Sequence, residues 1–236
     1  MPGSGYLLLK ASFCIRILHQ RVIVLLVVCI TFFVSFSSLA QTVTPFYTFN
    51  QSPIIQIHGL PAIGSARVLS ADRSRYSLIT DLASNSTARQ RSNEDVLFDG
   101  EIKRLTFSYT KGVGDNLEWG IRIPYVSHDG GSLDAFIEDW HDTFGLPQSS
   151  RDEAPHNRLT YRYTRNGNTL LNFTSSTDGI GDVRINGAWQ WRRAKKPDET
   201  NIAVRSSLSL STGDSKKLLG SGGSDVAFWI SADRVA

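Results

Sequence analysis

Hydrophobic and polar residues alternate along several stretches of the chain. In residues 117–125, apolar and aromatic side chains occupy every second position, with residues such as Glu118 and Arg122 between them. Successive side chains of a strand point to opposite faces, so this alternation predicts a strand with one apolar and one polar face. The same pattern predicts further strands in residues 76–82, 105–109, 183–191, 202–210 and 226–230.

Short and long connections alternate between these strands. A hairpin is expected in residues 158–175, because Asn166-Gly167 between two apolar runs is a strong signal for a two-residue turn. Tight turns are predicted at 111–116, 178–182, 194–199 and 211–214, and longer polar loops at 85–95, 127–157 and 213–224. Membrane barrels show such alternation, because their turns lie on one side of the bilayer and their loops on the other.

Two architectures fit this pattern: a soluble sandwich or barrel, and an outer-membrane barrel with lipid outside and a polar interior. The strands are about ten residues long, which is the length that a tilted strand needs to cross the hydrocarbon. Aromatic residues also gather near the predicted strand ends, as an interfacial girdle does: Tyr109, Tyr125, Trp189 and Trp191. The sequence therefore predicts an all-β fold, an antiparallel transmembrane (outer-membrane) β-barrel.

The two ends of the chain add to this prediction. Residues 1–40 are expected to be a secretory signal peptide, because an uncharged run ends in Ser38-Leu39-Ala40, small residues at the positions that a signal peptidase reads. Cleavage after Ala40 would export the chain to the bacterial outer membrane; an uncleaved inner-membrane anchor is the alternative. The chain stops within or just after a predicted strand, so we expect the N-terminal part of a longer, incomplete barrel.

Removal of the signal peptide changes the composition. Both cysteines, Cys14 and Cys29, lie within it, so the exported protein would form no disulfide. The loss of Lys10, Arg16 and Arg21 lowers the number of basic residues from 25 to 22, which equals the 22 acids. The mature chain is then neutral, and the basic pI of the whole sequence is no argument for nucleic-acid binding.

Residues 41–75 are expected to be a separate N-terminal segment ahead of the barrel strands, which would occupy residues 76–236. The stretch NQSPIIQIHGLP, residues 50–61, has an apolar centre too short to span a bilayer and two prolines that disfavour a central strand. The segment would fold into the barrel as a small plug or lie beneath it in the periplasm.

The long loop at 127–157 carries a cluster of acids around a histidine. Apolar residues from Leu133 to Phe144 recur at helical spacing, and Gly145 and Pro147 follow them, so a short amphipathic helix is expected. The candidate catalytic side chains on this helix are Glu138, Asp139, His141 and Asp142.

Two interpretations of this helix remain open. The acids and His141 could hold a cation or activate water, as in an outer-membrane hydrolase. Alternatively, the apolar face packs on the barrel rim or into its mouth, and the acids are solvated or paired to Arg151. His128 and His156 flank the loop, but scattered histidines are more typical of a polar surface than of a metal site. We expect no metal site and no cofactor.

Charged residues on the polar faces of the strands form a second candidate site. The residues expected to face the interior are Arg104, Glu118, Arg122, Arg184 and Arg205. They could select anions in a pore, or the arginines could pair with Asp81, Glu101 and Glu118 to brace the interior of a narrow barrel.

Three segments also resemble a known family: residues 50–61, the stretch FIEDWHDTFGLP (136–147) with Arg151 after it, and DGIGDVRINGAWQW (178–191). They resemble an uncharacterised family of Gram-negative bacterial proteins, domain of unknown function 3187, over most of the chain from about Thr44. The resemblance implies a signal peptide and an outer-membrane β-barrel, and it implies no reaction. Members of that family are usually longer, which agrees with an incomplete barrel here.

These observations together predict a non-enzymatic outer-membrane β-barrel protein, with a channel or small-solute transport role as the expected function. The expected partners are outer-membrane lipid and lipopolysaccharide, the barrel-assembly machinery and a small solute, with no nucleic acid. The alternatives are an outer-membrane hydrolase that uses the 127–156 loop and a soluble periplasmic β-rich binding protein.

Overall fold

The computed structural model describes residues 45, 47–58, 61–148, 151, 154–196 and 198–234. The predicted signal peptide, residues 1–40, lies outside these described residues. The strands are β1 (Ser74–Arg91), β2 (Glu94–Val113), β3 (Leu117–Asp129), β4 (Thr160–Arg165), β5 (Asn168–Phe173), β6 (Thr177–Ile180), β7 (Val183–Arg192), β8 (Thr200–Leu210) and β9 (Asp225–Arg234). The helices are α2 (Ile55–His58), α3 (Asp134–Phe144) and the single 3₁₀ turn η1 (Ser215–Lys217).

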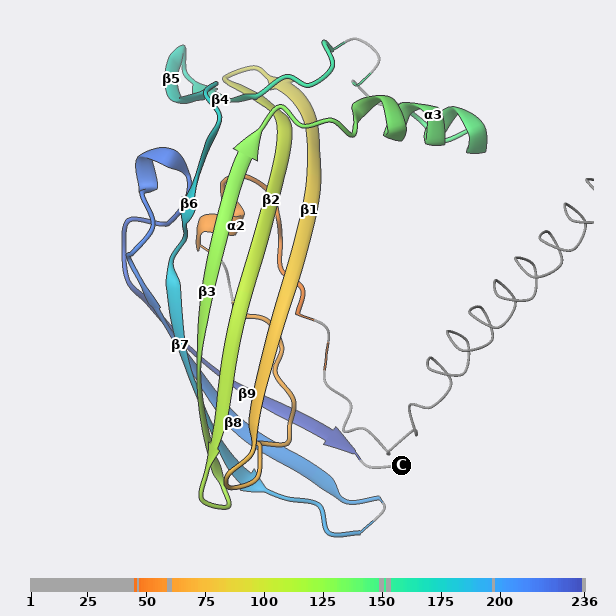
Figure 1. Ribbon diagram of the computed structural model, residues 1–236. Coiled ribbons are helices and arrows are strands. Elements are labelled where there is room, and N and C mark those ends of the chain that lie inside the picture. The colour runs from red at the N-terminus through yellow and green to blue at the C-terminus, as the bar shows by residue number, and fades with distance from the viewer. Residues whose placement is uncertain are drawn as a thin grey trace, which may run out of the picture. The chain divides into compact units, whose positions relative to one another are not determined.

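The strands form one antiparallel sheet that curls into a half-barrel (Figure 1). β1, β2, β3, β7, β8 and β9 follow one another across the sheet, and β6 lies beside the upper part of β3. The hairpin β4–β5 pairs with the upper part of β2 at the rim. The prediction of an all-β antiparallel fold is therefore confirmed. None of the helices in the described residues is long and apolar enough to span a bilayer.

The two faces of the sheet differ in polarity, and the apolar face is the exposed one. Cross-strand register brings Leu78, Phe107 and Ile123 side by side on the convex face, and all three are exposed. The same face carries other large exposed side chains: Tyr76, Leu82, Leu105, Leu117, Trp119, Tyr125, Ile185, Trp189, Val226, Phe228 and Ile230. The opposite, concave face carries the buried polar side chains of the sheet, among them Arg104, Thr106, Ser108, Gln190, Asn201, Ser207 and Ser209.

Two predicted connections are in fact strands. The expected loop at 85–95 is wrong, because β1 and β2 continue as a paired ladder up to Arg91 and Glu94 and leave only a two-residue turn. Residues 84–91 of β1 show no apolar alternation, so their sequence has no strand pattern. They pair with β2, whose other edge pairs with β4 at this level. The expected turn at 178–182 is also partly wrong, because β6 pairs with β3 up to Ile180. The pairing is then interrupted, and the chain continues as β7, which pairs with β3 farther down.

The predicted hairpin at 158–175 is confirmed as β4–β5, which turns at Asn166-Gly167. Both residues have positive φ, 51° at Asn166 and 75° at Gly167, as a type I′ turn requires. At the open end of the hairpin, Tyr161 is fully buried and packs edge-on against His128 and in parallel against Phe173. Burial raises the pKa of the Tyr161 hydroxyl, so the ring stays neutral in this rim cluster.

Replacement of Gly167 by alanine is expected to lower the free energy of unfolding by about 1–2 kcal/mol, because the backbone there is left-handed. A Cβ at this position would meet no atom within 4 Å, so the loss reflects conformation alone. Gly223→Ala is the matched control, because that site is equally open and needs no positive φ. Denaturant unfolding of both variants tests this, and equal losses would contradict it.

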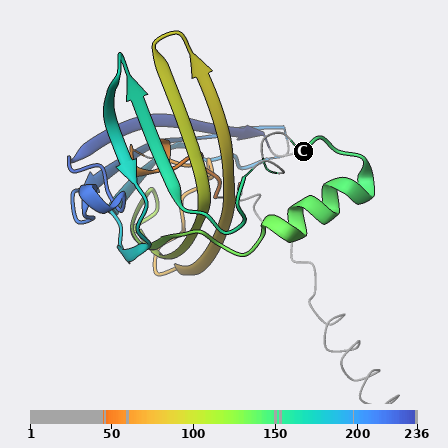
Figure 2. The same ribbon diagram turned by 90° about the horizontal axis from the view of Figure 1, so that it is seen from above.

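The described residues between 45 and 73, called here the N-terminal segment, run along the concave face inside the curl of the sheet (Figure 2). Polar side chains of the sheet hold its backbone. Gln190 accepts a hydrogen bond from the Val68 amide at 2.9 Å and donates one to the Ala66 carbonyl at 2.8 Å. Glu118 accepts a hydrogen bond from the Leu69 amide at 2.8 Å. The segment therefore covers polar groups that the concave face would otherwise expose.

Candidate functional site

Four arginines on neighbouring strands share the concave face: Arg104 on β2, Arg122 on β3, Arg184 on β7 and Arg205 on β8. They are called here the interior arginines. Each occupies a polar position in the alternation of its strand, so the strand geometry alone turns it inward. Arg122 lies directly opposite Arg184 in the register of β3 and β7. Like charges in directly opposite positions destabilise a sheet, so this pair opposes folding.

Arg205 forms an ion pair with a carboxylate of the same sheet. Its guanidinium lies 3.0 Å from Glu118, and the two side chains are only 10% and 9% exposed. Arg205 also donates through Nε to the Ser65 carbonyl at 2.8 Å. The predicted bracing pair thus forms, and it ties β3 and β8 to the N-terminal segment.

Arg104 is held by neutral groups of the N-terminal segment. Its guanidinium donates to the Gln56 side-chain oxygen at 2.9 Å and lies 4.7 Å from the centre of the Phe49 ring. Asp81 is directly opposite Arg104 in the β1–β2 register, but no ion pair joins the two. Glu101, another predicted partner of the arginines, lies on the convex side, where its carboxylate accepts hydrogen bonds from the Ser132 and Leu133 amides. That part of the bracing prediction is wrong.

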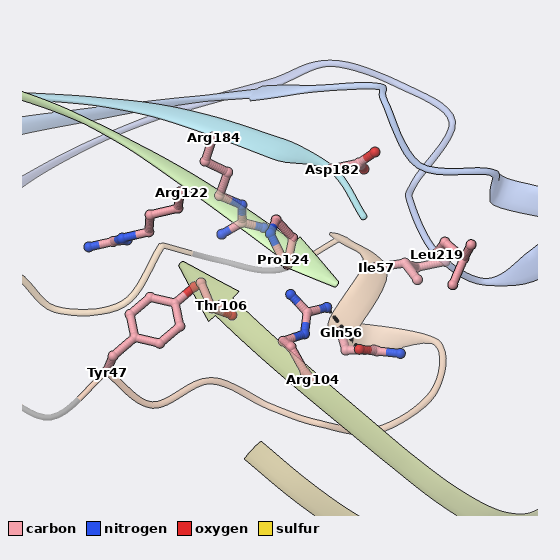
Figure 3. Close-up of a pocket in the computed structure, with 10 residues that line it drawn as sticks. All are labelled: Tyr47, Gln56, Ile57, Arg104, Thr106, Arg122, Pro124, Asp182, Arg184 and Leu219. Carbon is pink, nitrogen blue, oxygen red and sulfur yellow. Dashed lines mark hydrogen bonds between the residues drawn. The ribbon is translucent and has the colours of Figure 1, made fainter. Parts of the chain in front are cut away.

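Arg122 and Arg184 have no carboxylate partner among the described residues. The Arg122 guanidinium lies 4.7 Å from the centre of the Tyr47 ring, and its Nη1 is buried without a hydrogen-bond acceptor. Together with Arg104 they surround a small cavity of about 10 Å³ (Figure 3), which is room for about one water molecule. Asp182 also lines it, but its carboxylate accepts hydrogen bonds from the amides of Gly213 and Ser221. The space between the arginines is therefore electropositive.

A second cavity of about 390 Å³ lies beside the first, on the same face. Tyr47 and Arg122 line both cavities, and Glu118 and Arg205 line the second. The rest of its wall is mixed. Uncharged polar residues contribute to it, as do Arg75 and several apolar residues: Ser65, Ser77, Ser108, Thr110, Asn186, Pro45, Ile63, Ile79 and Trp119. This volume lies within the range of about 300–1,000 Å³ that small-molecule sites occupy. Three arginines, Arg75, Arg122 and Arg205, therefore border this space.

Side chains from the N-terminal segment and from β7 complete the site, and the sequence did not single them out. Tyr47, Gln56 and Gln190 contact groups far away along the chain, such as Arg122 in the case of Tyr47. The alternation in residues 183–191 predicts that Gln190 faces inward. It does not predict that the N-terminal segment supplies the backbone groups that Gln190 binds. One sequence feature pointed to these contacts: residues 50–61 were expected either to fold into the barrel as a plug or to lie beneath it.

The predicted helix in the long loop is confirmed as α3, with Gly145 in a left-handed C-cap at φ 64°. Its orientation differs from the expectation that the apolar face packs on the rim. Asp134 is buried in an ion pair with Arg151 at 2.8 Å, and it accepts a hydrogen bond from the Asn157 amide. The aromatic side of α3 is exposed. The acidic side of α3 faces the rim because Arg151 and the Asn157 amide bind Asp134 there.

The candidate catalytic residues on α3 do not converge. Glu138 pairs with His156 at 2.8 Å, and Asp142 accepts a hydrogen bond from the Gln148 side chain at 2.8 Å. No hydrogen bond joins His141 to Asp139 or Asp142. His128 is buried on the concave side and donates to the Leu218 carbonyl at 3.0 Å. Within the part of the chain that the structure describes, no group of three or more His, Cys, Asp or Glu side chains could hold a metal ion.

Fold and site together define a class of protein: a curled antiparallel β half-barrel that is apolar outside and lined with arginine inside. The chain belongs to the family described as protein of unknown function (DUF3187), whose sequence model matches residues 21–234. The chain matches no curated protein and no solved structure. The predicted family membership is therefore confirmed.

Proposed function

We propose that the protein is an outer-membrane β-barrel protein whose convex face contacts lipid and whose interior arginines admit small anionic solutes. One observation carries the first part of the proposal: the exposed face of the sheet is apolar and the enclosed face is polar and charged. A water-soluble sheet has the opposite arrangement, with its apolar face in the core. A face of this kind is stable where lipid, not water, surrounds it.

The positions of aromatic residues and connections also support a membrane location. Tyr76, Tyr109 and Trp119 form a contiguous aromatic group on the convex face, with ring centres 4.9 and 5.7 Å apart. Tyrosine and tryptophan favour the interface between hydrocarbon and water. The connections 114–116 and 193–199 at this end are shorter than 130–159 and 211–224 at the other, as in outer-membrane barrels. At that other end β1 and β2 are joined by the short turn 92–93, but both strands extend beyond the apolar surface there.

Folding without a bilayer distinguishes this proposal from a soluble periplasmic binding protein. The exported protein is expected to aggregate in buffer and to fold only with detergent or lipid vesicles, giving a band on cold gel electrophoresis that shifts after boiling. A folded monomer in buffer without detergent would show that the convex face does not need lipid.

The interior arginines support the second part of the proposal. The repulsion between Arg122 and Arg184 opposes folding, and neither side chain has an acidic partner among the described residues. Bracing explains Arg205 but not these two. An anion between the guanidinium groups would offset the repulsion through charge-assisted hydrogen bonds. The adjoining cavity of about 390 Å³ gives such a solute room.

Ion preference in planar bilayers tests the solute role. The wild-type protein is expected to favour chloride over potassium, and Arg122→Gln with Arg184→Gln should lower that preference several-fold, because the local positive charge is removed. The double variant should fold at least as stably as the wild type, since two opposed like charges are lost. Arg162→Gln, an exposed rim arginine that pairs with Asp95, is the control. An unchanged preference in the double variant, or no conductance in the wild type, would contradict the solute role.

A further inference from the structure

The amphipathic helix α3 exposes its aromatic side. Phe136, Trp140 and Phe144 are 62%, 51% and 59% exposed. Their rings follow one another along the helix, with centres 6.2 Å and 4.5 Å apart, and Leu146 extends the stripe beyond the C-cap. These residues are called here the α3 stripe. Large aromatic side chains in a continuous exposed row indicate a surface that another phase or molecule covers.

Polar contacts fix the direction in which the stripe faces. Asp134 is held by Arg151, and Glu138 by His156, so this side of the helix is turned to the rim. Residues four apart share a face of a helix, so Phe136, Trp140 and Phe144 lie on one side of α3, and the exposed Ala135 lies on another. The loop before α3 is fixed as well, since Glu101 accepts hydrogen bonds from two of its amides. The stripe is therefore presented by an anchored helix.

The anchors place α3 on the convex side of the sheet, at the edge of its apolar surface. Arg151 donates to the Ser84 hydroxyl at 2.9 Å. Ser84 is on the same face of β1 as the exposed Leu82 and is two residues farther along, which is about 7 Å at the rise of an antiparallel strand. The exposed pair Lys103–Asp129 lies on the same face at this level. Apolar surface therefore gives way to polar surface just below α3.

The direction of the helix fits this position. In Figure 1, α3 lies beside the upper ends of the strands and runs roughly perpendicular to them, and Figure 2 shows it outside the curl of the sheet. A bilayer that surrounds the convex face would end near the level of Lys103 and Asp129. A helix roughly perpendicular to the strands just above that level is about parallel to the bilayer surface.

We propose that α3 is an interfacial membrane helix, whose stripe of Phe136, Trp140 and Phe144 enters the lipid layer at the rim of the half-barrel. The inference rests on the proposed membrane location of the convex face. Lipid is favoured over a protein partner because the stripe continues the apolar surface that lipid would already cover. An interfacial helix inserts its apolar side about 5–10 Å into the headgroup and acyl boundary. The acids of α3 are compatible with this depth, because two of them are paired at the rim.

Fluorescence of Trp140 tests the proposal in vesicles of phosphatidylcholine with brominated acyl chains. The reporter protein keeps Trp140 as its one tryptophan, with phenylalanine at Trp119, Trp189, Trp191 and Trp229. Lipid brominated near the headgroup is expected to quench Trp140 more than lipid brominated near the chain end, and aqueous acrylamide should quench it weakly. The matched control carries Trp140→Phe and Ala135→Trp, which moves the reporter to an exposed position on the side of α3 away from the stripe; acrylamide should quench it strongly.

A second reporter separates this inference from the proposed membrane location. A protein with Trp119 as its one tryptophan reports on the convex face of β3. Quenching of Trp119 by brominated lipid without quenching of Trp140 overturns the α3 proposal alone, and absence of both overturns the membrane location as well. Trp140 shielded from acrylamide and brominated lipid alike would indicate a protein partner and also overturn the proposal. If a reporter with four substitutions fails to fold, the difference in quenching between wild type and Trp140→Phe gives the same answer.

Discussion

Replacement of Phe107 by arginine is expected to lower the free energy of unfolding of the bilayer-inserted protein by about 2–4 kcal/mol. Phe107 lies between Leu78 and Ile123 on the convex face, in the middle of the apolar surface. A guanidinium there would have to enter hydrocarbon or distort the bilayer around it. On the surface of a soluble protein the same change at a side chain 41% exposed would have little effect.

The size of the loss should depend on depth. Leu82→Arg is the matched control, because Leu82 is exposed on the same face but lies opposite Lys103 at the polar edge. There the expected loss is about 0–1 kcal/mol. Urea unfolding from lipid vesicles, followed by tryptophan fluorescence, measures both variants. Equal losses at the two positions would contradict a bilayer around the convex face.

Replacement of Glu118 by glutamine is expected to destabilise the protein by about 3–5 kcal/mol, because it leaves the charge of Arg205 buried without a partner. Both side chains are almost fully buried, and Glu118 also accepts the Leu69 amide, so the N-terminal segment loses one of its attachments. The pair Asp95–Arg162 provides the contrast. It is 3.3 Å long and about 40% exposed, and Asp95→Asn should change stability by less than about 1 kcal/mol.

A double-mutant cycle separates the pair from the single residue. If Arg205→Gln is added to Glu118→Gln, part of the lost stability should return, because no unpaired charge remains. The free energies come from denaturant unfolding of the four proteins. A loss below 1 kcal/mol for Glu118→Gln would show that water reaches Arg205 and that the concave face is more open than the structure describes.

Strands with one apolar face were predictable from sequence. Residues 117–125 alternate without a break and form β3, and 202–210 forms most of β8. The hairpin at Asn166-Gly167 was also predictable, since its turn chemistry is local. The inward direction of Arg122 and Arg205 follows from the same alternation, because a residue between two outward side chains must point inward.

Features that depend on distant partners were not predictable. The polar part of β1 after Leu82 pairs with β2, and β2 at this level also pairs with β4. No local sequence pattern predicts either contact. The orientation of α3 depends on Arg151, which is far enough along the loop that a helical pattern cannot show which side it would bind. The amphipathic pattern shows that the helix has an apolar side and a polar side. It does not show which of the two sides faces the rim. The placement of the N-terminal segment similarly depends on Gln190, whose partners lie more than a hundred residues away.

Spin labels along β3 test the lipid contact of the convex face most directly. Single labels are placed at successive positions 118–125 in protein whose Cys14 and Cys29 are replaced by serine, and collisions with oxygen and with a water-soluble nickel complex are measured in vesicles. Because oxygen concentrates in lipid, its collisions are expected to peak at 119, 121, 123 and 125. Nickel collisions should peak at the positions between them. Free access of nickel to Trp119, Ile121 and Ile123 would contradict a membrane-embedded half-barrel.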